Sequence, residues 1–280
     1  MLIDGVMLLW FLLTALSVAY VAIDIRSTPE NPVMKWAFVL FTLYSGPIGA
    51  FLYVLGCREP LPGLHEQYVA SRWRQALGST MHCVAGDGIG ILVGAVIGAL
   101  VALPMLADMM LEYVLGFGFG WTIFQALFMR DMFGTYARSL KGTFSAELLS
   151  MNCLMGGMML VASIAFAHGP GAHDPSQPLF WFRMSLALMF GALIAYPMNW
   201  WLIAHHLKHG MMTVRPRIET GQMPEMDAKA HLRMKDKMEM AVSTGSAIQS
   251  PSPTVLVMAA ISFAVLGLCA TIALAFGSGH

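Results

Sequence analysis

Three side chains that could bind a metal ion or carry a proton lie in the stretch MHCVAGDGIGILVGAVIG, at positions 81–98. They are His82, Cys83 and Asp87. Imidazole and thiolate groups suit zinc, iron or copper, and a carboxylate can complete such a site or accept a proton. Cys83 and Asp87 are four residues apart and share a helix face, whereas His82 points about 100° away. The pattern favours a transition-metal site or a proton-coupled polar cavity. The alternative is that these groups only join helices by hydrogen bonds.

The composition places this stretch in a membrane. The chain has 280 residues, of which 57% are hydrophobic and 11% charged, and its mean hydropathy is +0.66. Soluble domains carry about 25% charged residues. Several apolar runs are long enough to cross the hydrocarbon core as helices. We therefore predict an all-α, polytopic transmembrane helical bundle surrounded by lipid bilayer. The formal net charge of +0 gives no reason to expect a nucleic-acid partner.

The apolar runs predict seven spans, at 5–24, 34–57, 80–102, 105–129, 146–167, 180–204 and 253–276. Gly46–Pro47 predicts a kink within the second span. We divide the chain into two N-terminal spans with an interfacial connector (1–79), a four-helix core with the polar cluster (80–204), a cytoplasmic polar loop (205–252), and a C-terminal span with its tail (253–280). A short helix is expected in the loop, at 226–240.

The basic residues predict the orientation of the bundle. With seven spans, thirteen of the 16 Lys and Arg residues fall in the loops 58–79, 130–145 and 205–252, on one side of the membrane. Arg26, Lys35 and Arg183 fall on the other side. The positive-inside rule then places the N-terminus in the cytoplasm and the C-terminus outside. We expect the inner membrane of a bacterium, with a second copy or another membrane subunit as a possible partner.

Further polar residues in the spans are expected at the same depth as His82 and Cys83. They come from the fifth span and from the end of the sixth, and are Glu147, Asn152, Cys153, Asn199 and His205. Charged groups inside a bilayer are costly and usually face a partner or a wet cavity. His206 and His209 follow at the interface, where a solvated role or a headgroup contact competes with a ligand role.

A second polar group is expected near the outer ends of the spans. Asp108 and Glu112 lie one turn apart on the fourth span, and Arg183 enters the sixth at a similar depth. An ion pair between these helices is the simpler interpretation, and a carboxylate pair that receives a proton or cation is the alternative. His168, His173 and Asp174 in the nearby loop weakly resemble a surface metal site.

Glycine recurs every four residues along the third span, at Gly86, Gly90, Gly94 and Gly98. Such a ridge allows two helix backbones to come close together. The alternative is that these glycines leave room for the flat face of a cofactor such as haem or quinone.

Other patterns are weaker. The four cysteines have no CxxC spacing, and the 24 methionines could bind Cu(I) or simply fill gaps in the packing. The sequence contains no Walker loop, GxSxG, HExxH or dinucleotide-binding glycine motif. Whether the protein is an enzyme is left open.

Four segments, HCVAGDGIGI, EYVLGFGFGWTIFQALFMRDM, AELLSMNCLMGG and YPMNWWL followed by KHGMM, resemble an uncharacterised bacterial and archaeal membrane family that is catalogued as a domain of unknown function. The resemblance covers roughly 72–212, and its most specific element is HCxxGD. It implies that the third to sixth spans form the core. Some relatives carry copper-associated labels, which favours a metal role.

Three hypotheses of function follow. In the first, the protein transports or handles a soft, copper-like transition metal, with His82 and Cys83 as ligands and Asp87 as a ligand or proton acceptor. In the second, it is a membrane oxidoreductase or electron-transfer subunit whose histidines bind haem. In the third, it is a structural or assembly subunit, and its polar groups only hold helices together.

Overall fold

The computed structural model describes residues 2–165, 169, 171–214 and 253–277. Among them the regular structure is helical, apart from one isolated bridge between Glu30 and Thr213. The predicted all-α bundle is therefore confirmed. The helix expected at 226–240, the residue His168 and the tail 278–280 lie outside the described residues.

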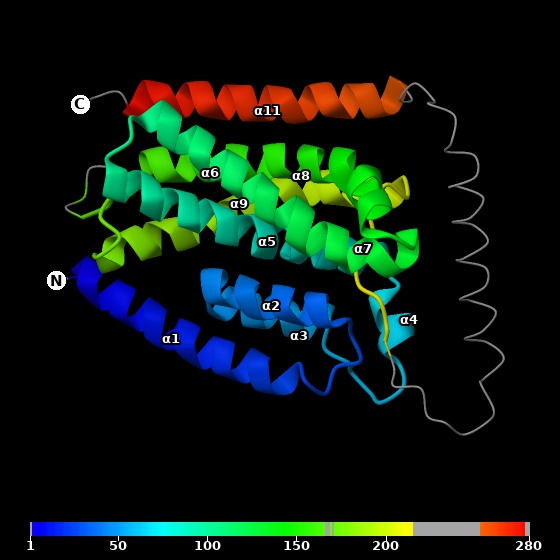
Figure 1. Ribbon diagram of the computed structural model, residues 1–280. Coiled ribbons are helices and arrows are strands. Elements are labelled where there is room, and N and C mark those ends of the chain that lie inside the picture. The colour runs from blue at the N-terminus through cyan, green and yellow to red at the C-terminus, as the bar shows by residue number, and fades with distance from the viewer. Residues whose placement is uncertain (1, 166–168, 170, 215–252, 278–280) are drawn as a thin grey trace, which may run out of the picture.

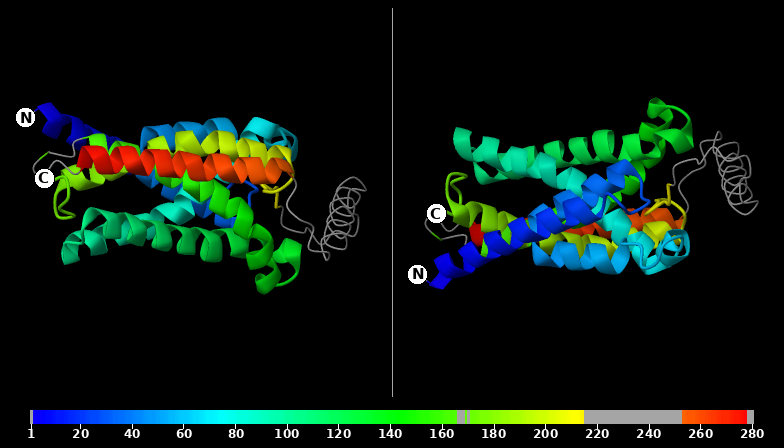
Figure 2. Two further views of the ribbon diagram at one scale, coloured as in Figure 1. Left: turned by 90° about the horizontal axis from the view of Figure 1, so that it is seen from above. Right: turned by 90° about the horizontal axis from the view of Figure 1, so that it is seen from below.

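The helices follow one another as a bundle of long, roughly parallel and antiparallel rods (Figures 1 and 2). They are α1 (Leu2–Asp24), α2 (Pro32–Ser45), α3 (Pro47–Gly56), α4 (His65–Val69), α5 (Arg72–Val101), α6 (Met105–Phe119), the π-helix η1 (Gly120–Gln125), α7 (Ala126–Phe133), α8 (Tyr136–Ile164), α9 (Pro178–Ala204) and α11 (Pro253–Gly277). α5 is central: it packs against α2, α6 and α9, while α8 packs between α9 and α11.

The predicted second span is a helical hairpin. Gly46 adopts a positive φ of 57° between α2 and α3, a conformation that glycine tolerates best. Glu30 precedes α2 and Cys57 follows α3, yet their side-chain ligand atoms lie within 4.8 Å of each other. In one continuous helix those residues would stand about 40 Å apart. The chain therefore enters the bundle, turns at Gly46 near Trp10 and Thr14 of α1, and returns to the end from which it came.

This hairpin changes the predicted topology. In the described part of the chain, six helices are long and apolar enough to cross a membrane, one fewer than predicted. The start of α1 and the end of α11 lie at the same end of the bundle (Figure 1). The prediction that the two termini lie on opposite sides depended on an odd number of crossings and does not agree with this arrangement.

The hairpin also moves two basic residues to the other end of the bundle. Arg26 and Lys35 flank the turn from α1 into α2, so they join the ends at which α3 stops and α5 starts. Nine of the ten Lys and Arg residues that the structure describes then lie at that end, namely Arg26, Lys35, Arg58, Arg72, Arg74, Arg130, Arg138, Lys141 and Lys208. Arg183 lies at the opposite end. We call the Lys208 end the basic end.

The glycines of α5 lie against α6 and η1. A Cβ at Gly90 would collide with the backbone carbonyl of Leu115, and one at Gly94 would come within 2.9 Å of Cα of Glu112. Gly86 faces Phe124, and Gly98 faces the carboxylate of Asp108. The two backbones therefore touch along this ridge. By contrast, α1 and α11 expose many large apolar side chains, for example Leu9, Leu16 and Leu268, as expected of helices that face lipid.

Candidate functional site

A lysine side chain reaches into the bundle from beyond the end of α9. The Nζ atom of Lys208 lies 2.8 Å from Oε2 of Glu147 on α8, and neither side chain is exposed to solvent. The same Nζ lies 2.6 Å from Sγ of Cys83 on α5. Sγ of Cys83 is also 3.6 Å from Oε2 of Glu147, so the three groups form a closed triangle. We call Cys83, Asp87, Glu147 and Lys208 the buried centre.

The chain reversal after α9 explains how Lys208 gets there. His206 adopts a positive φ of 57°, and the N–H of Leu207 donates to the carbonyl of Leu202, which closes the helix end. The following residues then lie against the start of α5. The amide of Gln75 donates to the carbonyl of Met211, and a Cβ at Gly210 would collide with the carbonyl of Gln75. The side chain of Lys208 is therefore directed inward between α5 and α8.

Asp87 lies one turn further along α5 and is fully buried. Neither oxygen of its carboxyl has a hydrogen-bond partner. Gly120, the first residue of η1, makes room for it: a Cβ there would collide with Oδ1 of Asp87 and lie 3.2 Å from Oε1 of Glu147. Two carboxyl groups thus face the same glycine, and only the ion-paired one has a partner.

His82 is buried beside this centre. Its ring packs against Phe128 and Phe124, with centroids 5.0 Å and 5.7 Å away, and its Nε2 atom has no hydrogen-bond partner. His82, Cys83 and Asp87 do not form a group of three ligand atoms within 4.8 Å of one another, the spacing at which Glu30, Cys57 and His65 do meet among the described residues.

Two asparagines that were predicted for this layer form hydrogen bonds between helices. Oδ1 of Asn199 accepts hydrogen bonds from Ser79 at 3.3 Å and Ser150 at 3.1 Å, which joins α9 to α5 and α8. Asn152 accepts from Tyr113 at 2.6 Å and donates to Ser262 at 3.2 Å.

Cys153 is buried, but within the described residues no hydrogen bond or ion pair connects it to the buried centre. His205 is exposed, and its ring packs at a tilt against Trp201, with the ring centroids 4.5 Å apart. Sequence reasoning missed Lys208, which lies outside every predicted span; its only signal was its place in the KHGMM segment.

The predicted ion pair at the opposite end has a different geometry. Among the described residues, no pair within 4.0 Å joins Arg183 to Asp108 or Glu112. Asp108 and Glu112 face the glycines of α5, as described above, and Nη1 of Arg183 lies 3.3 Å from Nε2 of His173.

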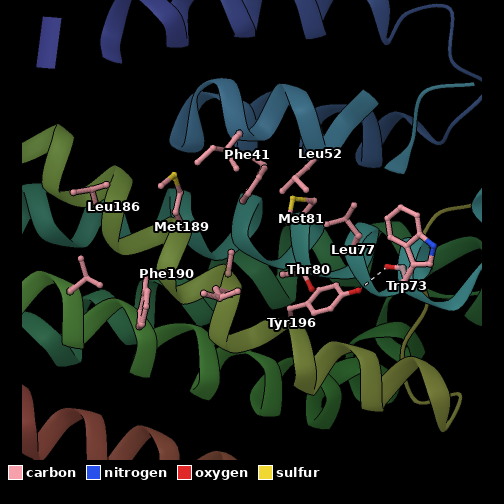
Figure 3. Close-up of a pocket in the computed structure, with 14 residues that line it drawn as sticks. Phe41, Leu52, Trp73, Leu77, Thr80, Met81, Leu186, Met189, Phe190 and Tyr196 are labelled. Carbon is pink, nitrogen blue, oxygen red and sulfur yellow. Dashed lines mark hydrogen bonds between the residues drawn. The ribbon is translucent and has the colours of Figure 1, made fainter. Parts of the chain in front are cut away.

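A groove between the hairpin, α5 and α9 has a volume of about 680 Å³ (Figure 3). Its lining is almost entirely apolar, and includes Phe41, Leu77 and Phe190. The polar atoms there are few: the hydroxyl of Tyr196 donates to the carbonyl of Trp73 at 3.3 Å. None of the residues of the buried centre lines this groove.

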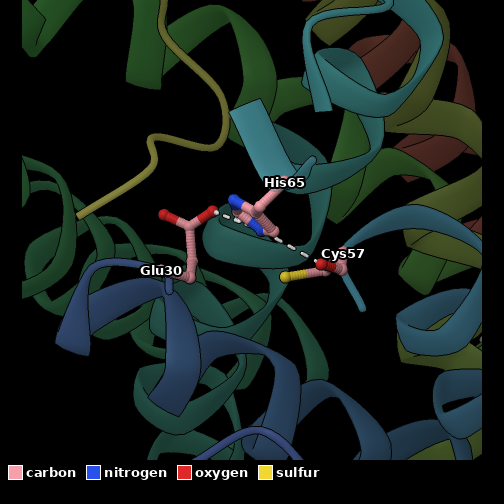
Figure 4. A group of neighbouring side chains, drawn as sticks. All are labelled: Glu30, Cys57 and His65. Atoms are coloured by element: carbon pink, nitrogen blue, oxygen red, sulfur yellow. Dashed lines mark hydrogen bonds and ion pairs between the residues drawn. The ribbon is translucent and has the colours of Figure 1, made fainter. Parts of the chain in front are cut away.

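A second cluster stands where the hairpin opens at the basic end (Figure 4). It consists of Glu30, Cys57 and His65, all buried, and it could hold a metal ion. Nε2 of His65 lies 4.0 Å from Oε2 of Glu30. Burial raises the pKa of Glu30 to about 8 and raises that of the Cys57 thiol well above its usual value. No spacing in the sequence marked these three residues.

The fold and the buried polar groups together define a multi-pass integral membrane protein. Its residues 72–208 match the model of the family described as a domain of unknown function, DUF4396. This match begins with α5 and ends at Lys208, so it contains the whole buried centre and excludes Glu30, Cys57 and His65. No curated protein and no solved structure matches the chain.

Proposed function

We propose that the protein is a proton-coupled membrane transporter and that Asp87 is its proton-binding group. The observation that carries the proposal is the full burial of a carboxyl without any hydrogen-bond partner, beside an ion pair that is itself fully buried. Ionisable groups inside membrane bundles commonly belong to ion pathways and proton relays.

The charges of the buried centre support a proton on Asp87. Lys208 and Glu147 balance each other, so an ionised Asp87 would leave one uncompensated negative charge in a site buried away from the protein surface. Such a charge costs several kcal/mol even after relaxation. Holding a proton removes this cost. Asp87 can release this proton when Lys208, which interacts electrostatically with Asp87, moves its ammonium group towards the new carboxylate.

The distribution of basic residues supports an orientation. Nine described Lys and Arg residues lie at the basic end, and by the positive-inside rule they favour a cytoplasmic position for this end. Both termini then lie outside. The buried centre would exchange its proton with the cytoplasm through the segment that carries Lys208. A bacterial inner membrane fits this orientation.

Purified protein in liposomes that contain a pH-sensitive dye tests the proposal. Under an imposed proton gradient and membrane potential, we expect the wild type to change the internal pH faster than protein-free liposomes, alone or with one of a panel of ions. The Asp87→Asn variant should return to the protein-free rate. The Asp4→Asn variant, which removes an exposed carboxylate in the first turn of α1, should retain the wild-type rate. Wild-type liposomes that never exceed the protein-free rate would refute the proposal.

Handling of a soft transition metal is the second candidate, and one observation favours it. Cys83 and Glu147 already hold a cation, the ammonium of Lys208, between a sulfur and an oxygen. A copper-like ion could take this place, near His82 and Asp87, if Lys208 withdrew. Metal analysis of the wild type and of His82→Ala and Cys83→Ala distinguishes the two: metal that is bound by the wild type and lost from both variants supports this second function.

The same preparation tests the haem and assembly hypotheses. A Soret absorption band would support a haem-binding oxidoreductase. A purely structural role predicts no proton flux and no metal, with Asp87→Asn affecting only stability.

A further inference from the structure

We infer that Glu30, Cys57 and His65 bind one zinc-type metal ion at the mouth of the α2–α3 hairpin. The inference is independent of the proposed function, because the cluster shares no residue with the buried centre. The cluster comes from three segments: the turn before α2, the residue that follows α3, and the first residue of α4. An ion held here would fasten both ends of the hairpin to the basic end of the bundle.

The carboxylate is already oriented for this role. Oε1 of Glu30 accepts hydrogen bonds from the backbone N–H groups of Asn31 and Met212, both at 2.9 Å. Oε2 has no hydrogen-bond partner although the side chain is completely buried, and it is directed towards His65. Buried polar atoms without partners are rare, and an absent ion is one of the standard reasons for them.

The imidazole has the second contact that metal-bound histidines usually have. Nδ1 of His65 lies 2.8 Å from Oγ1 of Thr213, and Nε2 lies 3.1 Å from the carbonyl of Cys57. If Nδ1 carries the proton and donates it to Thr213, the lone pair of Nε2 faces Glu30 and Cys57. Metal-bound histidines are commonly oriented by such a hydrogen bond on the other ring nitrogen.

The donor set indicates which ion fits. One nitrogen, one sulfur and one oxygen ligand suit zinc, whereas Cu(I) prefers sulfur ligands. Bonds of about 2.0–2.3 Å to one tetrahedral ion hold ligand atoms about 3.3–3.8 Å apart. The three ligand atoms lie within 4.8 Å of one another, and Nε2 of His65 and Oε2 of Glu30 are 4.0 Å apart, so binding requires these side chains to move closer together. Three protein ligands leave a fourth position, which a water or the carbonyl of Cys57 can occupy. Binding must displace the proton of the Cys57 thiol, so affinity should rise with pH.

Cobalt titration of the full-length, chelator-treated protein tests the inference, because a cobalt–thiolate bond absorbs light. We expect one equivalent of Co²⁺ to give a thiolate charge-transfer band that one equivalent of Zn²⁺ abolishes. Cys57→Ser should remove the band, and His65→Gln and Glu30→Gln should weaken affinity by at least about tenfold. Cys153→Ser, which changes another buried cysteine, should keep the band and the affinity.

A second measurement covers variants that fold poorly. At the same Zn²⁺ concentration, the melting temperature should rise less for the nearly isosteric Glu30→Gln than for the wild type, because an ion stabilises the folded state according to its affinity for that state. The inference is overturned if the wild type binds no cobalt or zinc, or if the band survives Cys57→Ser. A band that depends on Cys83 instead would place the metal in the buried centre and would support the second candidate function.

Discussion

At the scale of single residues, Lys208 is the least expected member of the buried centre. A lysine side chain without solvent contact loses its hydration and survives only with partners. Glu147 and Cys83 provide them, at 2.8 Å and 2.6 Å. The burial of Lys208 therefore requires the reversed segment after α9 to be held in place, which ties the fold of that segment to the centre.

Removing the charge of Lys208 should destabilise the protein strongly. Lys208→Met leaves Glu147 buried without its counter-ion, a change that typically costs about 3–5 kcal/mol. Thermal or denaturant unfolding in detergent measures this loss. The double variant Lys208→Met/Glu147→Gln should recover much of the stability. A double variant as unstable as the single one would contradict the assignment of an ion pair.

The contribution of Lys208 to the free energy of unfolding should not vary with pH over the neutral range. Burial by itself lowers the pKa of this lysine, but Cys83 and Glu147 outweigh that effect and raise the pKa above its ordinary value of 10.5. A raised lysine pKa gives stability that is complete below the unfolded value and is lost only as pH rises through the folded value.

The stability difference between the wild type and the double variant Lys208→Met/Glu147→Gln should accordingly stay constant from about pH 7 to about pH 9, because this double variant has no buried Glu147 carboxyl that could take up a proton. Melting curves of the two proteins across this range check it. A difference that shrinks steadily between these limits would mean that Lys208 loses its proton well below its ordinary pKa.

The sequence allowed Cys83, Asp87 and Glu147 to be predicted in one layer, because each is a rare ionisable residue in an apolar run. Helical spacing and depth were sufficient for that. Lys208 could not be predicted, since its side chain reaches the layer only through the backbone conformation of His206 after the helix. Glu30, Cys57 and His65 meet only through the folding of the hairpin.

At the scale of elements, the hairpin is the main departure from expectation. Residues 34–57 have the hydropathy and length of a span. Hydropathy does not show whether such a segment crosses the membrane or turns back within it. Gly46–Pro47 predicts an interruption of the helix, and a kink is the form expected from the sequence. The positive φ of Gly46 reverses the chain instead. Non-helical backbone inside a membrane is tolerated where protein surrounds it, and Gly46 is buried against Trp10 and Thr14 of α1.

The glycine ridge of α5 gives a prediction at this scale. Gly90→Ala places a methyl group against the backbone of α6, which cannot move as a flexible side chain could, and should cost about 1–3 kcal/mol. Gly118→Ala on α6 is the matched control, because no atom lies within 4 Å of the added carbon. Melting temperatures of both variants check the prediction. Equal effects would mean that close packing is not what Gly90 provides.

At the scale of the whole molecule, charge and topology agree once the hairpin is recognised. Counting seven spans left Arg26 and Lys35 as exceptions on the side with few basic residues. Six candidate spans and a hairpin bring them to the basic end, and of the described Lys and Arg residues Arg183 alone lies opposite. The positions of Arg26 and Lys35 in the sequence are compatible with a hairpin. The hairpin itself is recognised only from the spatial closeness of Glu30 and Cys57.

This topology predicts that both termini are on the same side, outside the cytoplasm. Epitope tags added separately to the N-terminus and the C-terminus should both be accessible to antibody in intact spheroplasts. A cysteine introduced at the exposed Glu66 of α4 should react with an impermeant maleimide only after the membrane is opened. Tags found on opposite sides would contradict the six-span arrangement.

The central claim is that Asp87 carries a proton inside the bundle, and infrared spectroscopy tests it most directly. A protonated carboxyl absorbs as a carbonyl, separately from an ionised carboxylate. The spectrum of the wild type minus that of Asp87→Asn at neutral pH should contain a carboxylic-acid band, shifted in heavy water. Asp108→Asn, with its carboxylate outside the buried centre, should leave that band in place. A difference spectrum with only carboxylate bands would show an ionised Asp87 and would contradict the account.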